Sequence, residues 1–214
     1  MGEEVLGVDE QAPVTPVVTM WQTFCSGMEE IAPLVAERLG VPTYQQAFTS
    51  EEIWAAMDSG GPDSAIWFLV GATGNAPRAF DRLLPGVRKE QRRWAEKVTA
   101  EVRADAVGGG VIMGRVGTII LRDRPGALHV KLDAPREVRL ARAEERFGIP
   151  ARTAKEWLEW EDEVRSQIAI DTFNWNPLEN DYYDLVVNTW HRDAEMWAEI
   201  IVAAVRVVVA RARP

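Results

Sequence analysis

The chain contains a single cysteine, two histidines and fewer basic than acidic residues, 24 Lys and Arg against 33 Asp and Glu in 214 residues. The formal net charge of −9 argues against binding to nucleic acid polymers or anionic membranes, because both require a basic surface. Cys25 alone cannot form an intrachain disulfide or a cysteine-rich metal site. His129 and His191 have no ligand partners at metal spacing, so we expect both to be structural and predict no metal site.

Long hydrophobic runs are also missing from the chain. The longest apolar segment, residues 197–213, is interrupted by Arg206 and is too short to span a bilayer. Residues 1–16 are acidic, contain two prolines and lack the apolar core of a signal peptide, so we expect a flexible tail. These features predict a cytoplasmic protein without a membrane partner.

What the chain does contain is an alternation of strand-like and helix-like segments. The β-rich runs cover residues 17–21, 111–115, 127–135 and 182–189. The helical patterns cover residues 28–39, 89–106, 137–147, 153–172 and 192–211. Such alternation predicts an α/β fold with a parallel sheet and helices on both faces. Ligands of these sheets bind beyond the carboxyl ends of the strands, here near residues 22–27, 114–115, 133–135 and 188–189.

The first of these strand ends is built like a phosphate-binding loop. Residues 17–40 predict a strand, a tight turn and a helix, and Ser26 and Gly27 are small enough for backbone N–H groups to approach a phosphate. Met28, however, stands where such a loop has lysine, and two glutamates follow. A carboxylate about 4 Å from a phosphate charge is repelled by roughly 4 kcal/mol at an effective dielectric constant of 20. An ordinary strand–turn–helix connection therefore stays an equal alternative.

Four strand ends together resemble the cytidylate kinase-like family, a branch of the P-loop nucleoside monophosphate kinases. The matching stretches are "CSGMEEI", "VIMGR", "LDAPREVRLAR", an Asp-x-x-Arg pattern at Asp162 and Arg165, and "YDLVVNT". The similarity runs over residues 17–209 and is weakest over 44–87. It implies a P-loop-kinase-like three-layer fold with one domain over 17–214, an acceptor-binding excursion near 41–88 and a lid near 148–180.

The resemblance also implies an activity, the transfer of a phosphoryl group from ATP with Mg²⁺ to a pyrimidine nucleoside monophosphate such as CMP or dCMP. It assigns the phosphate-binding loop to Cys25, Ser26, Gly27 and Met28, acceptor binding to Gly114, Arg115 and Tyr44, and catalysis to Arg139, Arg142, Arg165 and Asp162. The chain departs from the family pattern in the loop, where Cys25 and Met28 replace glycines and Glu29 replaces an arginine. It also departs after Tyr44, where a carboxylate is missing.

Several of these residues also have a purely structural interpretation. Arg115 could pair with a carboxylate of the lid, and Arg142 taken alone fits a solvated helix surface. Cys25 begins a helix, which favours a thiolate, but the neighbouring glutamates oppose it. Three tryptophans near the lid could stack on a base, although core or subunit contacts are commoner for such residues: Trp157, Trp160 and Trp175.

Three hypotheses about function therefore stay open. The first is an active nucleotide kinase, and the second is a catalytically inactive pseudokinase that binds nucleotide. The third is a protein-interaction scaffold, which nine tryptophans in the chain favour and which allows a homodimer.

Overall fold

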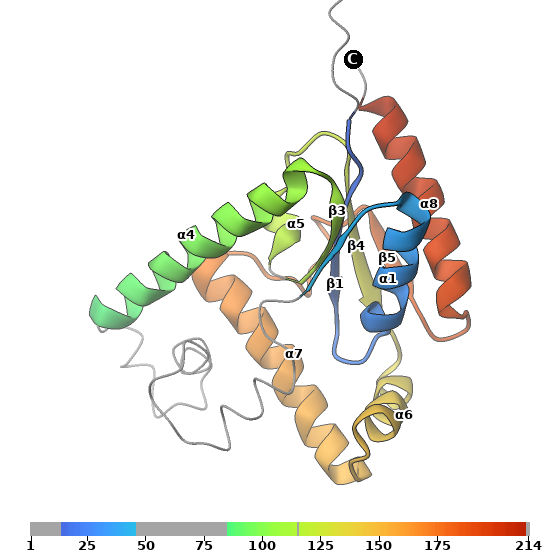
Figure 1. The fold of residues 1–214 in the computed structure, drawn as a ribbon. Coiled ribbons are helices and arrows are strands. Elements are labelled where there is room, and N and C mark those ends of the chain that lie inside the picture. The colour runs from blue at the N-terminus through green and yellow to red at the C-terminus, as the bar shows by residue number, and fades with distance from the viewer. Residues whose placement is uncertain (1–13, 46–84, 115, 213–214) are drawn as a thin grey trace, which may run out of the picture.

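A computed structural model of the protein describes residues 14–45, 85–114 and 116–212. It contains one sheet of five parallel strands in the order β2–β3–β1–β4–β5 (Figure 1). The strands are β1 (Val17–Gln22), β2 (Thr43–Tyr44), β3 (Gly110–Met113), β4 (Ala127–Asp133) and β5 (Leu185–Asn188). The central strand, β1, is paired along its length with β4 and over four residues with β3. The parallel sheet that the alternating pattern predicts is confirmed.

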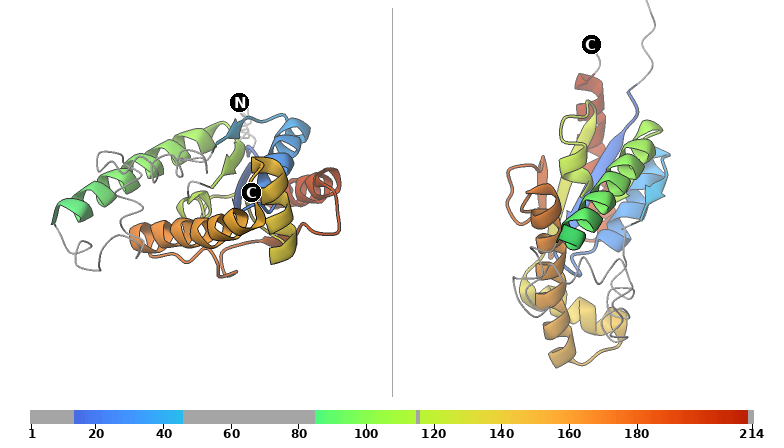
Figure 2. Two further views of the ribbon diagram at one scale, coloured as in Figure 1. Left: turned by 90° about the horizontal axis from the view of Figure 1, so that it is seen from below. Right: turned by 90° about the vertical axis from the view of Figure 1, so that its left-hand side faces the viewer.

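Helices cover both faces of this sheet (Figures 1 and 2). They are α1 (Met28–Leu39), α4 (Pro85–Val107), α5 (Gly117–Ile120), α6 (Arg136–Phe147), α7 (Ala151–Phe173) and α8 (Ala194–Arg211). α1 and α8 pack on one face, whereas α4 and α5 pack on the other. α7 packs against α6 and α4 beyond the carboxyl edge of the sheet. The predicted three-layer α/β class is therefore confirmed.

The core explains why the strands have apolar sequences. β1, β3 and β4 are buried on both faces, so apolar residues occupy most positions of β1 and β3, whereas His129 and Lys131 interrupt the apolar residues of β4. On the face of α1 and α8, the largest cluster joins Val18, Met20 and Val130 to Ile31 and Ile201. No described helix combines the length and hydrophobicity needed to cross a membrane.

The predicted helices agree with the observed ones to within a few residues, and α1 has the predicted bounds. Pro33 lies inside α1 without ending it. β2 and α5 were not predicted, because elements of two and four residues are too short to show a period. Most of the predicted excursion over 41–88 lies outside the described residues. The predicted lid over 148–180 contains the single helix α7.

Candidate functional site

The loop between β1 and α1 keeps the shape of a phosphate-binding turn. Cys25 and Gly27 both adopt left-handed backbone conformations, with φ angles of 59° and 93°. Glycine accepts this region readily, whereas a residue with a Cβ occupies it uncommonly. Alternation of this kind makes successive N–H groups converge on one side of the chain, which creates a concavity suited to an anion.

Two N–H groups of this loop donate to side chains of the chain itself. The Phe24 N–H donates to Asp162 Oδ1 at 2.7 Å, and the Met28 N–H donates to Gln22 Oε1 at 2.9 Å. For the N–H groups of Cys25, Gly27 and Glu29, by contrast, no acceptor lies within hydrogen-bond distance in the part of the chain that the structure describes. The loop is thus partly occupied by its own side chains, and three of its donors stay available.

The Asp162 carboxylate joins the lid helix to the loop. Its second oxygen accepts from Arg139 Nη1 at 2.6 Å, and the same nitrogen lies 3.4 Å from the Phe24 carbonyl oxygen. Arg139 comes from α6 and is almost completely buried. The carboxylate therefore lies between a loop amide and an arginine, which is the environment that a bound anion would have.

Arg165, the other member of the expected Asp-x-x-Arg pair, has a different neighbour. Its Nε donates to Glu161 Oε2 at 2.6 Å, and Glu161 is completely buried. Because the two residues lie four apart on α7, they form an ion pair along the helix. The structure thus brings Asp162 together with Arg139 and not with Arg165.

Arg142 lies at the loop as well and is held by the end of β5. Its two terminal nitrogens donate to Thr189 Oγ1 and to the Thr189 carbonyl, both at 2.9 Å, and Nη1 lies 3.5 Å from the Cys25 carbonyl oxygen. The interpretation of Arg142 as a solvated surface residue is therefore wrong, because packing and three acceptors fix its guanidinium group. α6 delivers both Arg139 and Arg142 to the loop, since residues three apart share a helix face.

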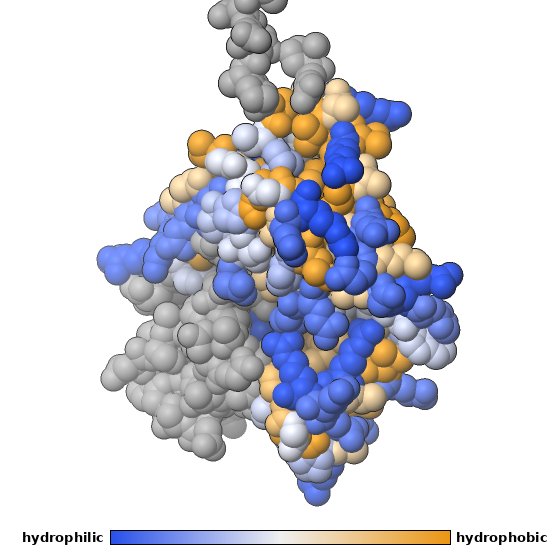
Figure 3. Space-filling view, turned by 45° about the vertical axis from the view of Figure 1, so that its right-hand side comes forward, coloured by the Kyte–Doolittle hydropathy of each residue, from blue (hydrophilic) through white to orange (hydrophobic). Residues whose placement is uncertain are grey.

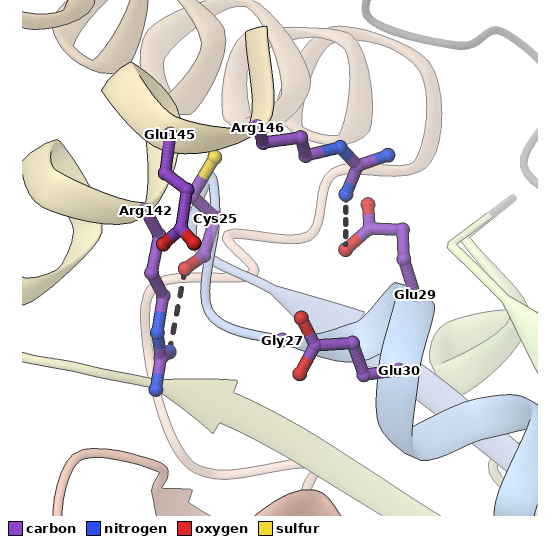
Figure 4. Close-up of a pocket in the computed structure, with 7 residues that line it drawn as sticks. All are labelled: Cys25, Gly27, Glu29, Glu30, Arg142, Glu145 and Arg146. Atoms are coloured by element: carbon purple, nitrogen blue, oxygen red, sulfur yellow. Dashed lines mark hydrogen bonds and ion pairs between the residues drawn. The ribbon is translucent and has the colours of Figure 1, made fainter.

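A pocket of about 320 Å³ opens between this loop and α6 (Figure 4). Its lining residues are Cys25, Gly27, Glu29, Glu30, Arg142, Glu145 and Arg146. Three carboxylates and two guanidinium groups give the lining a formal charge of −1. Such a pocket accepts an anion only where the arginines and the loop N–H groups outweigh the carboxylates.

Glu29, whose charge opposes phosphate binding in the sequence, is neutralised in the structure. Its Oε2 lies 3.1 Å from Arg146 Nη1 (Figure 4). Its Oε1 accepts from Gln22 Nε2 at 2.8 Å. A carboxylate held by a guanidinium group repels a nearby phosphate less than a free one does. The predicted repulsion of roughly 4 kcal/mol is therefore an upper bound for this loop.

Met28, at the position where a phosphate loop has lysine, points into the apolar core. Only 1% of its surface is exposed, and it belongs to the cluster on the face of α1 and α8. Its side chain fills core volume and cannot reach a phosphate on the other side of the loop. Within the described residues, no lysine takes the place of the missing one at this turn.

Cys25 does not act as a thiolate here. Burial and, to a smaller extent, the Glu29 carboxylate raise the pKa of the Cys25 thiol to about 12. The thiol is therefore protonated at neutral pH. Burial and the Glu29 carboxylate outweigh the stabilisation of a thiolate by the helix N-terminus.

Hydroxyl groups connect the ends of three strands beneath the loop. Thr23 Oγ1 lies 2.6 Å from both Ser26 Oγ and Asp133 Oδ1, and Thr189 Oγ1 donates to the Ser26 carbonyl at 2.9 Å. The sequence signal for this network is a polar residue at the end of β4 and directly after β1 and β5. Among the described residues, no group of three or more His, Cys, Asp and Glu side chains is placed to hold a metal ion.

The predicted acceptor residues are not gathered at one place. Arg115 lies outside the described residues. Gly114 follows β3 with a φ angle of 58°, and its N–H donates to the Met20 carbonyl at 2.7 Å. Tyr44 pairs with Ile112 of β3, but its ring extends back toward Gly110, where a Cβ would come within 2.4 Å of the ring. The structure therefore does not bring the Tyr44 ring together with Gly114.

The lid tryptophans belong to the core. Trp160 and Trp175 have exposed fractions of 8% and 3%, and Trp157 packs edge-on against Phe147 at a centroid distance of 5.3 Å. The core interpretation of Trp160 and Trp175 is confirmed.

Comparisons with known proteins agree with this arrangement. A sequence model of the cytidylate kinase-like family matches residues 17–191. Among curated proteins, a uronate isomerase from Corynebacterium glutamicum is 32% identical over 110 residues, which are 51% of this chain and 21% of that protein. This chain thus spans about a fifth of the length of that relative.

Two solved structures superpose on this chain to different degrees. An uncharacterized protein from Eubacterium ventriosum superposes with a TM-score of 0.64 at 17% identity, covering 90% of this chain and 99% of the other. An unliganded sugar kinase from Janibacter sp. superposes with a TM-score of 0.49 at 21% identity, covering 92% and 97%. At 17% identity, the first likeness establishes a shared fold and nothing about activity.

Proposed function

This chain belongs to the cytidylate kinase-like family, and from that premise we propose that it binds a nucleoside phosphate without transferring the γ-phosphoryl group of ATP. The observation that carries this proposal is Asp162, whose carboxylate oxygens accept from the Phe24 N–H and from Arg139. Kinases direct loop N–H groups and arginines at the phosphoryl group that is being transferred. In this chain the Asp162 carboxylate already binds one loop N–H group, that of Phe24, and one arginine, Arg139.

Transfer would also need positive charge that the loop lacks. Phosphoryl transfer spreads negative charge over the equatorial oxygens, and catalysis consists largely of positioning and of neutralising that charge. The side chain at the lysine position is Met28, which is buried in the core. The Asp162 carboxylate neutralises Arg139. The residue after Met28 is Glu29, an acid that itself takes up the charge of Arg146. These features support binding without turnover.

Binding of a phosphate ester needs fewer groups than its transfer. The N–H groups of Cys25, Gly27 and Glu29 are available, and they lie at the N-terminus of α1, where the helix dipole favours an anion. Arg142 Nη1 lies 3.8 Å from the Cβ position of Gly27, so its guanidinium group stands over the same turn. We propose these four residues as the phosphate-binding groups.

The second candidate is an active kinase for CMP or dCMP, with Arg115 and Gly114 on the acceptor. The observation in its favour is that Arg139 and Arg142 both reach the loop from α6. In this candidate Asp162 would have to release the Phe24 amide and Arg139 when ATP binds. Mg²⁺ would enter with the ATP phosphates, because among the described residues no group of three or more His, Cys, Asp and Glu side chains is placed to hold a metal ion by itself.

The similarity to part of a uronate isomerase adds one class of ligand to the test. A hexuronate carries a carboxylate, which an arginine and backbone N–H groups bind in the same way as a phosphate. We therefore include glucuronate beside the nucleotides as a candidate ligand of the pocket.

Ligand-dependent thermal unfolding tests the proposal directly. The purified protein is heated with CMP, dCMP, UMP, AMP, glucuronate or Mg·ATP, singly and as pairs of ATP with each acceptor, while a coupled assay follows ADP release. A ligand at 100 times its dissociation constant adds about 2.7 kcal/mol to the free energy of unfolding. We expect a nucleoside phosphate to stabilise the protein while ADP release stays at the background rate.

A matched pair of variants identifies the role of Asp162. Asp162→Asn removes the negative charge between Phe24 and Arg139, so we expect nucleotide affinity to rise several-fold. Glu159→Gln is the control, because Glu159 lies on the same helix but forms an exposed ion pair with Arg136. Acceptor-dependent ADP release by the wild-type protein would establish the active kinase instead. Absence of any nucleotide shift in both wild type and Asp162→Asn would refute nucleotide binding.

A further inference from the structure

α8 carries a stripe of apolar side chains that its packing in the subunit leaves exposed. The exposed fractions of Met196, Ile200 and Val207 are 40%, 42% and 51%, and Ala203 is exposed between them. Figure 3 brings the side of the molecule with α8 forward and shows hydrophobic surface between charged residues at its upper right. Apolar residues scattered singly over a surface are ordinary, whereas apolar residues that lie next to one another on a surface often mark a contact site.

The spacing of the stripe is that of a helix–helix seam. Its members, Met196, Ile200, Ala203 and Val207, follow one another at intervals of four, three and four residues. This is the a/d pattern with which two helices interdigitate their side chains. The buried face of α8 consists of other residues, among them Ile201 and Val205, which pack on α1 and the sheet. α8 thus has two apolar faces, and the fold of one subunit uses only one of them.

Opposite charges flank the stripe on one side. Glu199 and Arg206 lie seven residues apart, about 10 Å along the helix, next to the apolar positions. Neither has an ion-pair partner among the residues that the structure describes. Glu195, one turn before Glu199, is by contrast held by Arg38 of α1. The two free charges are therefore available to a partner that presents the same charges in reverse order.

We propose that this stripe binds the α8 helix of a second copy of this chain in an antiparallel arrangement. In that arrangement Met196 packs against Val207 of the second copy, and Ile200 packs against Ala203, so each layer pairs a larger with a smaller side chain. Glu199 of each copy then faces Arg206 of the other, which gives two equivalent ion pairs, because a two-fold contact repeats every pair. The inference concerns a surface separate from the nucleotide pocket and does not depend on the proposed function.

The charges select the antiparallel direction. In a parallel pair the residues that flank the seam meet those of the next heptad, so Arg206 would face Arg211 and Glu199 would face Ala204. One contact is repulsive and the other is neutral, whereas the antiparallel pair has two attractive contacts. Two helices bury less than the area of a standard stable interface, so we expect a weak dimer whose mass depends on concentration.

Sedimentation equilibrium from about 5 to 500 µM full-length protein tests the dimer, since weak association appears only as concentration rises. We expect the wild type to approach twice the monomer mass at the upper end. Ile200→Glu places two carboxylates in the seam and is expected to raise the dissociation constant at least about 100-fold. Arg206→Glu makes both flanking contacts repulsive and is expected to raise it roughly tenfold.

The charge-swap variant identifies the geometry. Glu199→Arg combined with Arg206→Glu restores the attraction, so we expect the double variant to dimerise like the wild type. Val107→Glu is the matched control, because Val107 is 71% exposed on α4, outside the stripe. A monomer at every concentration, a dimer that Ile200→Glu leaves unchanged, or no rescue by the charge swap would each overturn the proposal.

Discussion

The two faces of the sheet are buried to a similar degree but with different chemistry. On the face of α1 and α8, β1 and β4 place apolar side chains such as Val18 and Val130. On the opposite face, the residues in between include Thr19, His129 and Lys131, all at most 6% exposed. Since successive residues of a strand point to opposite faces, the same two strands supply both surfaces.

The polar face is held by specific bonds rather than by volume alone. Thr19 Oγ1 lies 2.7 Å from His129 Nδ1 and 3.0 Å from Thr118 Oγ1 of α5. Lys131 Nζ donates to the Leu178 carbonyl at 2.5 Å and to Asn180 Oδ1 at 3.0 Å, which fixes the segment after α7. The comparison teaches that the face of α1 and α8 is stabilised by apolar packing. The other face combines an apolar cluster under α4 with hydrogen bonds that position the chain around the carboxyl edge. The apolar face should therefore respond to lost volume, and the polar face to lost charge and to pH.

The largest effect is expected from a cavity in the apolar face. Ile201 of α8 is completely buried in the cluster with α1, and Ile201→Ala removes several of its methyl and methylene groups. The lost transfer free energy and the remaining cavity should lower the free energy of unfolding by about 2–5 kcal/mol. Urea unfolding followed by far-ultraviolet circular dichroism measures this loss from the shift in midpoint.

The neighbouring residue provides the control for this cavity. Ile200 lies on the same helix but is 42% exposed, so Ile200→Ala should cost about 1 kcal/mol or less at a low protein concentration. Equal losses in the two variants would mean that burial on this face does not determine stability.

A smaller effect is expected on the polar face when the charge of Lys131 is removed. Burial lowers the pKa of the Lys131 ammonium group, yet its two acceptors keep it in place. Lys131→Met preserves the length of the side chain and loses both bonds, so we expect a loss of about 1–2 kcal/mol. Hydrogen exchange should also become faster in residues 174–184. Lys97→Met is the control, because the Lys97 side chain is 73% exposed, and unchanged exchange in Lys131→Met would contradict the positioning role.

Much of the fold could be predicted from the sequence because its sheet is parallel. Buried parallel strands are short apolar runs between helical patterns, and both patterns are visible in a single sequence. α1 was predicted to the residue, since the turn at Gly27 and the left-handed Gly40 mark its two ends. The face on which each helix packs was not predicted, because it depends on crossover connections rather than on local pattern.

The sequence indicated which residues lie at the carboxyl edge of the sheet but only part of their contacts. Polar residues at the end of β4 and after β1 and β5 marked this edge, and Arg139 and Arg142 do contact the loop there. The bond between Phe24 and Asp162 joins residues 138 apart, so only the packing of α7 against the loop creates it. In the same way, the sequence predicted that Glu29 repels a phosphate, because its partner Arg146 on α6 is distant in the sequence. Local pattern identifies the groups, and tertiary packing decides which of them are already neutralised.

The smallest effect is expected from the buried imidazole of His129, which should make the free energy of unfolding depend on pH. Burial lowers the pKa of His129 below its ordinary value of 6.5, so the folded protein favours the neutral imidazole. As pH falls through 6.5, the unfolded chain binds a proton that the folded chain does not, and this part of the stability is lost as pH falls toward the folded pKa. Each pKa unit of lowering corresponds to about 1.4 kcal/mol. Urea unfolding at a series of pH values between 7.5 and 5 should show this decline, at roughly the range where histidine titrates.

His129→Gln separates this contribution from that of the carboxylates, which titrate mainly at lower pH. The variant has no imidazole to protonate, so its stability should change less between pH 7.5 and 5.5 than that of the wild type, roughly the window of a histidine. His191→Gln is the control, since His191 is exposed, and its profile should follow the wild type. A wild-type profile parallel to that of His129→Gln would mean that the buried imidazole does not couple folding to pH. The polar face would then differ from the apolar one only in its hydrogen bonds.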